Sequence, residues 1–285
     1  MPRDEVQPRG VQPGAVQRNA VQRNYGDTAR FYAERWADQL AGQARELVGG
    51  LSLAGARAVL DLGCGPGRLL PHLAEQAPAA HVVGADITEA MLALAPQSFA
   101  RVVGDAQALP FRGAAFDAVV MSFVLPHLAE PFVGLSELHR VVRPGGLVGL
   151  LTWGAATPPA AYDAWLDCVE AAGAPPDPRP MMHTTLDTTD PDAMRTAVGS
   201  AGFAEVRVRL RPFRWQPSLP EFLEHSLSIG VAARRVALLP CDARRACIAA
   251  ARERLAALSD DDFLREATVL HTTGWRPTGA AEERA

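Results

Sequence analysis

The chain has 285 residues, of which 48% are hydrophobic and 21% are charged, and its formal net charge is −4. This composition is that of an ordinary globular protein, and it excludes a chain that is disordered or fibrous throughout. The near-balance of charge argues against a broad positive field, so we expect no nucleic-acid partner. All 28 basic residues are arginine, which excludes Schiff-base chemistry and a phosphate-binding lysine.

The four cysteines form no CxxC pair and no zinc-type spacing with histidine, so we expect reduced thiols and no metal site. No apolar run approaches the roughly 18 residues that cross a bilayer, and the start of the chain lacks the apolar core of a secretory signal. The sequence therefore predicts a cytoplasmic protein that does not contact the membrane.

The N-terminal segment repeats Val-Gln at five-residue spacing, from Val6 to Val21. This period matches neither a helix face nor a packable repeat unit, and the interleaved Pro, Gly, Arg and Asn disfavour regular structure. We predict a disordered tail over residues 1–22, with a docking arm as the alternative. Asp27 is then a plausible N-cap for an amphipathic helix that ends at Gly49.

The next part of the chain alternates short apolar runs with helical stretches. Strands are predicted at residues 58–62, 82–85, 100–103, 116–121 and 147–153, with helices between them. Such alternation is typical of a doubly wound parallel sheet that is covered on both faces.

The pattern changes after Trp153. Proline-rich and helical segments at about 154–189 and 214–262 are predicted to be insertions that form a helical lid over the carboxyl edge of the sheet. A helix at 190–201 and strands at 204–210 and 267–273 continue the sheet pattern. We therefore predict one domain over 23–276, followed by a tail at 277–285. Three tryptophans, Trp153, Trp165 and Trp215, could line an aromatic pocket, with ordinary packing as the alternative.

The segment VLDLGCGPGR places Gly63, Gly65 and Gly67 between the first strand and a helix. Glycines there allow a ligand to approach the backbone closely. A dinucleotide site needs G-x-G-x-x-G, whereas the third glycine here comes one residue early, which disfavours NAD.

Acidic residues end the neighbouring strands. Asp86 follows the glycines by about twenty residues, where a carboxylate can accept both ribose hydroxyls, and Ile87 can lie against a purine. Asp105 can accept from an exocyclic amine, and Asp61 can attract an ammonium group. These residues suit a nucleoside that carries an amino acid better than one that carries phosphates.

The motifs VLDLGCGPGR, GADITEAML, GDAQALPF, FDAVVMSFVLPHL and ELHRVVRPGG resemble, in that order, those of class I S-adenosylmethionine-dependent methyltransferases. The resemblance is to the type 11 small-molecule branch, which includes the ubiquinone/menaquinone-type enzymes, and it covers about residues 25–153. It implies a Rossmann-like sheet of seven strands with a reversed last strand, and S-adenosyl-L-methionine as the cofactor.

The resemblance also implies residue roles. Asp61, Gly63 and Gly65 would hold the methionyl part, and Ser122 would offer a backbone contact near it. Asp86 would bind the ribose, and Asp105 and Ala106 the adenine. The segment YGDTARFY is similar to the Tyr-Asp and Tyr pair of the family, so Tyr25 and Tyr32 are expected to close over the cofactor.

Transfer from a sulfonium is an in-line displacement that needs alignment and exclusion of water. A phenolic acceptor must also lose a proton, and His127 matches a histidine that small-molecule methyltransferases often carry there. We expect His127 either to be the base or to pack, because Pro126 stands where relatives have another histidine. The lone His183, His225 and His271 are expected to be structural.

The sequence thus predicts methylation of a small molecule, on oxygen, in bacterial secondary metabolism. The alternatives are C- or N-methylation of a quinone or natural product, or a methyltransferase fold that acts as a cyclase or does not transfer methyl groups.

Overall fold

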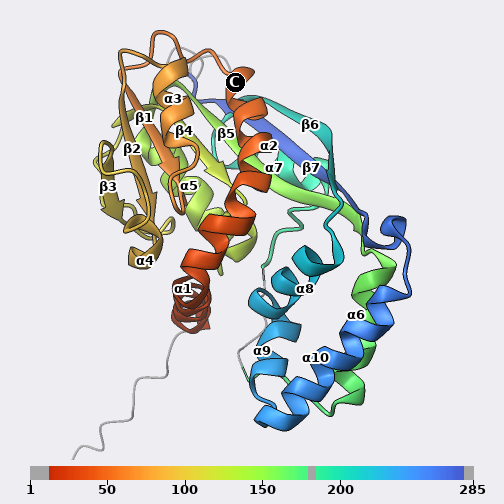
Figure 1. Ribbon diagram of the computed structural model, residues 1–285. Coiled ribbons are helices and arrows are strands. Elements are labelled where there is room, and N and C mark those ends of the chain that lie inside the picture. The colour runs from red at the N-terminus through yellow and green to blue at the C-terminus, as the bar shows by residue number, and fades with distance from the viewer. Residues whose placement is uncertain (1–12, 179–183, 279–285) are drawn as a thin grey trace, which may run out of the picture.

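A seven-stranded sheet forms the centre of the computed structural model, which describes residues 13–178 and 184–278 (Figure 1). The strands are β1 (Ala58–Leu62), β2 (His81–Asp86), β3 (Ala100–Val103), β4 (Phe116–Ser122), β5 (Val142–Thr157), β6 (Ala204–Trp215) and β7 (Arg265–Trp275). They lie in the order β3-β2-β1-β4-β5-β7-β6. Strands β1 to β5 pair in parallel, and β7 is antiparallel to both β5 and β6. This confirms the doubly wound sheet and its reversed last strand.

Helices join the strands and cover the sheet. They are α1 (Pro13–Phe31), the π-helical turn η1 (Tyr32–Trp36), α2 (Ala37–Gly49), α3 (Leu70–Gln76), α4 (Glu89–Leu92), the 3-10 turn η2 (Leu125–His127), α5 (Pro131–Val141), α6 (Ala160–Ala171), α7 (Pro191–Ser200), α8 (Leu219–Ser228), α9 (Val231–Ala237), α10 (Cys241–Ala256) and the 3-10 turn η3 (Asp260–Phe263). No helix in the described part of the chain is both long and apolar enough to cross a membrane.

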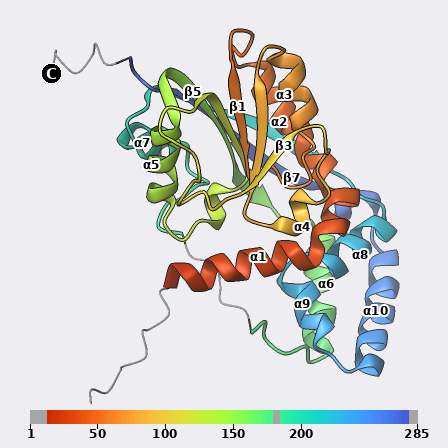
Figure 2. The same cartoon turned by 90° about the vertical axis from the view of Figure 1, so that its left-hand side faces the viewer.

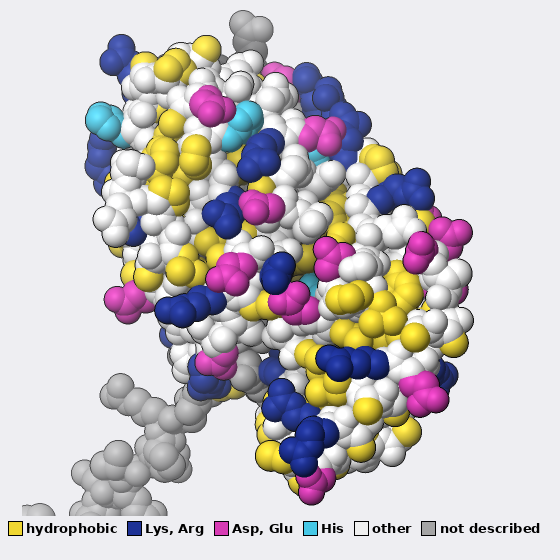
Figure 3. Space-filling view, viewed as in Figure 1, with side chains coloured by type: hydrophobic (Ala, Val, Ile, Leu, Met, Phe, Trp, Pro, Cys, Tyr) yellow, Lys and Arg dark blue, Asp and Glu magenta, His cyan; other side chains and the backbone are white. Residues whose placement is uncertain are grey.

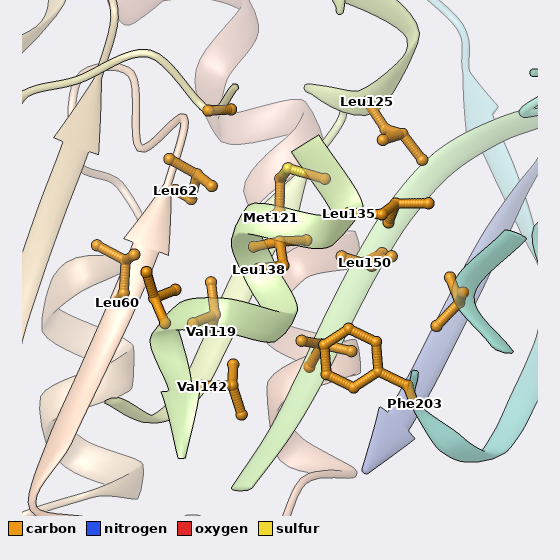
Figure 4. Close-up of a cluster of buried hydrophobic side chains, with 14 of the residues drawn as sticks. Leu60, Leu62, Val119, Met121, Leu125, Leu135, Leu138, Val142, Leu150 and Phe203 are labelled. Atoms are coloured by element: carbon orange, nitrogen blue, oxygen red, sulfur yellow. The ribbon is translucent and has the colours of Figure 1, made fainter. Parts of the chain in front are cut away.

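Alternating side chains of the strands build two cores, one on each face of the sheet. Leu60 and Met121 face one way and pack with residues of α5 and α7, including Leu138 (Figure 4). Val59 and Val120 face the other way and pack with residues of α2 and α3. Burial on both faces explains why these strands are nearly continuous apolar runs, which is the pattern that predicted them.

The predicted strands agree with the observed ones closely in the first half of the sheet. β1 and β3 have the predicted bounds, while β2 and β4 extend the predictions by one or two residues. β5 is longer than predicted because Arg143 to Gly146 continue the strand rather than ending the preceding helix. Thr88 stands at the N-cap position of α4, although its side chain makes no capping hydrogen bond.

The N-terminal segment differs from the prediction. Residues 13–22, expected to be part of a disordered tail, form the first turns of α1, and Asp27 lies inside this helix rather than capping a later one. No proline follows Pro13 before Pro66, so the segment from Ala15 can form a continuous helix. Figure 2 shows α1 lying across the carboxyl ends of the parallel strands. Residues 1–12 lie outside the described residues.

Both predicted insertions are largely helical. Helices α6, α8, α9 and α10 form a layer beside the sheet with its own core, around the fully buried Trp165. This helical layer contacts α1, since Arg234 of α9 donates to the side-chain oxygen of Asn24 at 2.8 Å. The face in Figure 3 mixes acidic and basic side chains, with apolar side chains gathered over the helical layer.

Replacement of Trp165 tests whether the helical layer depends on its own core. We expect Trp165→Ala to lower the free energy of unfolding by about 3–5 kcal/mol, because it removes the largest side chain of that core and leaves a cavity. Urea unfolding measures this change. Trp165→Phe is the matched control, since it fills most of the volume and removes a buried indole N–H that has no partner among the described residues. Equal effects of the two variants would contradict this prediction.

Candidate functional site

A cavity opens at the carboxyl ends of β1, β2, β3 and β4, beneath α1, and encloses about 1010 Å³ with its mouth included. The switch in strand order between β1 and β4 lies here, which is where open α/β sheets bind ligands. The predicted residues that line it are Tyr25, Tyr32, Gly63, Gly65, Asp86, Ile87, Asp105, Ala106, Ser122 and His127. Asp61 lines a smaller hollow that adjoins it, together with Gly63, Gly65 and Ser122.

The glycine loop after β1 has the backbone conformation that its sequence predicts. Gly63 has a φ of +73°, and a Cβ there would come within 2.0 Å of Val124. Gly65 has a φ of +52°, and its nearest neighbour would be Tyr32 at 3.9 Å, so the space beside it is open. The loop therefore offers bare backbone to a ligand at the edge of the cavity.

Backbone amides hold Asp86 at the end of β2. Its two carboxylate oxygens accept hydrogen bonds from the N–H groups of Gly65 and Thr88, at 2.9 and 2.8 Å. A carboxylate has about four lone-pair sites, so Asp86 retains acceptor capacity toward the cavity. The glycine loop and the end of β2 are thus fixed to each other through this side chain.

Ionised Asp61 is energetically unfavourable in the empty site, because its charge is buried and no counterion lies against it among the described residues. It is 2% exposed, and its Oδ2 atom has no hydrogen-bond partner among the described residues. Burial and the nearby charge of Asp86 raise the pKa of Asp61 to about 7. A ligand that brings a cation to this place would remove the imbalance, and the ammonium of an amino acid has that chemistry.

Helix α1 closes the cavity from above. Gln17 and Gln22 donate to the backbone oxygens of His127 and Ile87, at 3.2 and 3.0 Å. Arg18 donates to Asp105 Oδ2 at 3.1 Å. These residues share one face of α1 with Val21 and Tyr25, which also line the cavity. Both glutamines belong to the Val-Gln repeat, which is therefore part of the site.

Tyr25 and His127 form a hydrogen-bonded pair at the cavity wall. The Tyr25 hydroxyl lies 2.9 Å from His127 Nε2. Burial and the charge of Asp86 raise the pKa of Tyr25 to about 12, so the hydroxyl keeps its proton and we assign it as the donor. Burial lowers the pKa of His127 to about 4, which keeps this imidazole neutral at physiological pH.

The end of the cavity beside β4 and β5 is aromatic. Phe123, with a φ of +59°, follows β4, and its ring lies 4.8 Å from that of Trp153. Trp36 of η1 completes this wall. Trp153 thus lines the cavity as predicted, whereas Trp165 lies in the core of the helical layer. Trp215 contacts Trp36 from behind, at 5.0 Å.

Helix α1 and η1 contribute residues that were not predicted: Arg18, Val21 and Trp36 line the cavity, and Gln17 and Gln22 hold α1 against the loops at its edge. A signal was present, because residues 17, 18, 21, 22 and 25 repeat at the spacing of one helix face. The described residues contain no group of three or more potential metal ligands from His, Cys, Asp and Glu. His183 lies outside the described residues.

Comparison with known proteins identifies a family model and curated relatives that match part of the chain. The family model Methyltransf_11, a methyltransferase domain, matches residues 60–150. The demethylmenaquinone methyltransferase of Clavibacter sepedonicus is 40% identical over 128 residues, which are 41% of this chain and 50% of that protein. The demethylmenaquinone methyltransferase of Roseiflexus castenholzii is 30% identical over 165 residues, 53% of this chain and 69% of that protein. The chain spans about half the length of the first curated relatives it matches.

Solved structures with low sequence identity share the fold. The methyltransferase in complex with the Haloferax volcanii Trm112 methyltransferase activator has a TM-score of 0.53 and 19% identity, over 90% of this chain and 98% of that one. The Haemonchus contortus phosphoethanolamine N-methyltransferase 2 in complex with S-adenosyl-L-methionine has a TM-score of 0.52 and 18% identity, over 95% of this chain and 62% of that one.

The buried charge of Asp61 predicts pH-dependent ligand binding. The ionised carboxylate attracts an ammonium group, so we expect the affinity for S-adenosylhomocysteine to rise as the pH increases through about 7 and then to level off. Asp61→Asn should lower the affinity at pH 8 by about tenfold or more and abolish this pH dependence. Calorimetric titration between pH 5.5 and pH 8.5 measures both effects.

Asp61→Asn should weaken ligand binding but stabilise the ligand-free protein. Folding raises the pKa of Asp61 from its ordinary value of 3.8, so the folded chain keeps a proton that the unfolded chain releases between that value and about 7. Ionisation of the buried group therefore costs stability as the pH rises through this window, and the cost persists above it. Asp61→Asn should accordingly raise the melting temperature of the ligand-free protein at pH 8. A lowered melting temperature would contradict our account of the charge.

Proposed function

Because the chain belongs to the class I S-adenosylmethionine-dependent methyltransferases, in the ubiquinone/menaquinone-type branch, we propose that it transfers a methyl group from S-adenosylmethionine to a small aromatic acceptor. The observation that carries this proposal is the convergence of Gly65, Asp86 and Asp105 on one cavity, next to the unpaired carboxylate of Asp61. Each of these groups has a counterpart on an adenosyl nucleoside that carries an amino acid.

The proposed roles follow from these positions. Asp61 binds the ammonium of the methionyl part, while Gly63, Gly65 and the backbone of Ser122 surround that part. Asp86 accepts hydrogen bonds from the ribose hydroxyls. Asp105 accepts from the adenine amine, the backbone N–H of Ala106 donates to a ring nitrogen, and Ile87 lies against the purine.

The cofactor supplies a methyl group that is activated by its positively charged sulfur. The chain aligns the acceptor with that methyl group and keeps water out. Tyr25, Tyr32 and α1 cover the cavity on the cofactor side, and Phe123 and Trp153 offer flat apolar surfaces for an aromatic acceptor. The neutral imidazole of His127 accepts the acceptor's hydroxyl proton once Tyr25 releases its Nε2 atom.

The proposal also concerns which atom of the acceptor receives the methyl group. Loss of a hydroxyl proton increases electron density both on oxygen and on the neighbouring ring carbon, so one base serves either transfer. After transfer to carbon, the hydrogen on that carbon leaves as a proton to solvent, which restores the aromatic ring. The sequence alone leads us to expect methylation on oxygen. Relatives named demethylmenaquinone methyltransferase and ubiquinone/menaquinone biosynthesis C-methyltransferase instead support a ring carbon, and we propose carbon on that ground.

Two measurements test the proposed function. Calorimetry should detect S-adenosylhomocysteine binding that falls by about tenfold or more in Asp86→Asn, because the ribose loses a charged acceptor. Asp192→Asn is the matched control, since this carboxylate lies at the surface of α7. Incubation of the enzyme with a cell extract and S-adenosylmethionine labelled with ¹³C in its methyl group should give a product about 14 Da heavier than its precursor apart from the label. The chemical shift of the labelled methyl group then distinguishes oxygen from carbon. Absence of cofactor binding would contradict the proposal.

The role of His127 has its own test, with the acceptor found in that experiment. We expect His127→Ala to lower kcat by about a hundredfold or more while the affinity for S-adenosylhomocysteine changes by less than about threefold. The acidic fall of kcat in the wild type should lie near pH 4 rather than near pH 6.5, because burial lowers the pKa of His127. His72→Ala, on α3, is the control. Equal and small effects of His127→Ala on both quantities would assign this residue to packing.

A further inference from the structure

Arg265 is a half-buried cation with no counterion. It is the first residue of β7, where the sheet meets the helical layer (Figure 1). Its guanidinium lies over the ring of Trp153, 5.0 Å from the ring centre. Across residues 13–178 and 184–278, no carboxylate or carbonyl oxygen pairs with it.

The other half-buried arginines show how unusual this is. Arg140, Arg211, Arg234 and Arg235 pair with Glu137, Glu46, Asp177 and Glu170, and Arg276 donates to backbone oxygens of His139 and Val142. A charge that leaves water without a partner costs free energy, and proteins normally offset this cost within the chain. At Arg265 no oxygen of the described residues offsets this cost, so a bound anion could do so.

The neighbours of Arg265 do not supply a negative charge. Glu266, the next residue, pairs with Arg214. His225 lies close enough for Arg265 to disfavour its charged form, and its pKa is lowered to about 4, mainly by burial, so it is neutral. The Tyr162 hydroxyl is the remaining polar group that acts on Arg265. The described neighbours of Arg265 are therefore aromatic and uncharged.

This arrangement adjoins the acceptor end of the cavity. Trp153 lines the cavity and carries Arg265 over its ring, while Trp36 lines the cavity and contacts His225 at 4.6 Å. A guanidinium stacked on an indole keeps its N–H groups free at the edge, where they can bind a carboxylate with two parallel hydrogen bonds. An aromatic ring that lies against Trp153 would bring its substituents to that edge.

We propose that the acceptor is a hydroxylated aromatic carboxylate, and that Arg265 binds its carboxylate group while the ring lies against Trp153. The inference rests on the proposed function, because it needs an acceptor beside the cofactor. It narrows that function to an anionic substrate class and makes Arg265 the residue that determines specificity for it.

Calorimetry tests this proposal without a methyl-transfer assay. The protein is first saturated with S-adenosylhomocysteine and then titrated with each of the three hydroxybenzoate isomers and with the matching hydroxybenzamides, which carry the same ring without the charge. We expect at least one hydroxybenzoate to bind about tenfold or more tightly than its amide. Arg265→Gln should abolish this preference and leave the amide affinity unchanged, whereas Arg265→Lys should retain part of it.

Arg214→Gln is the matched control, because it removes the same charge one strand away, from a residue that is paired and exposed. It should leave every affinity unchanged. Amides that bind as well as the acids, no detectable binding of any hydroxybenzoate, or an undiminished preference in Arg265→Gln would each overturn the inference. Failure of S-adenosylhomocysteine itself to bind would instead overturn the proposed function, so the two failures are distinguishable. Thermal unfolding of each variant confirms that it is folded.

Discussion

Two carboxylates buried at neighbouring strand ends are the constraint on which the rest of the site depends. Asp61 is 2% exposed and Asp86 is 8% exposed, and burial raises the pKa of both carboxyl groups. The backbone N–H groups of Gly65 and Thr88 offset the charge of Asp86, whereas Oδ2 of Asp61 has no hydrogen-bond partner among the described residues. Such a pair is unfavourable for the empty protein and favourable once a cationic ligand binds. The carboxylates that lower the stability of the empty protein are thus the ones that attract a cationic ligand.

Much of the sheet and of the cofactor side could be predicted from the sequence, because local rules decide both. The apolar runs of β1 and β4 must be buried on two faces, and glycines between a strand and a helix permit conformations that other residues resist. Asp86 ends β2 and Asp105 comes two residues after β3, so their place at the carboxyl edge follows from the parallel topology. Prediction and structure agree most closely where residues near one another in the sequence determine the local structure.

The N-terminal segment could not be predicted by the same rules, because its order comes from tertiary contacts. As an isolated segment, the Val-Gln repeat has too few apolar residues to favour a stable helix. In the folded chain, Gln17, Arg18 and Gln22 reach polar groups on the rim of the sheet, and Arg234 of the helical layer reaches Asn24. These polar contacts are invisible to a search for hydrophobic periodicity. Helix α1 therefore covers the cavity of the sheet and also contacts the helical layer.

The cofactor and the acceptor differ in how well they can be inferred, because the family model covers the strand ends that would bind the cofactor. The family model ends at residue 150, and the proposed cofactor contacts from the sheet all precede that point. Trp153, which lines the cavity, and Arg265, which lies over its ring, come after it. Selection between acceptors depends on the polar groups that a correct substrate satisfies and a wrong one leaves unpaired. Among the half-buried arginines described here, Arg265 is the one whose charge the chain leaves unpaired, so the acceptor's charge is the first property to establish.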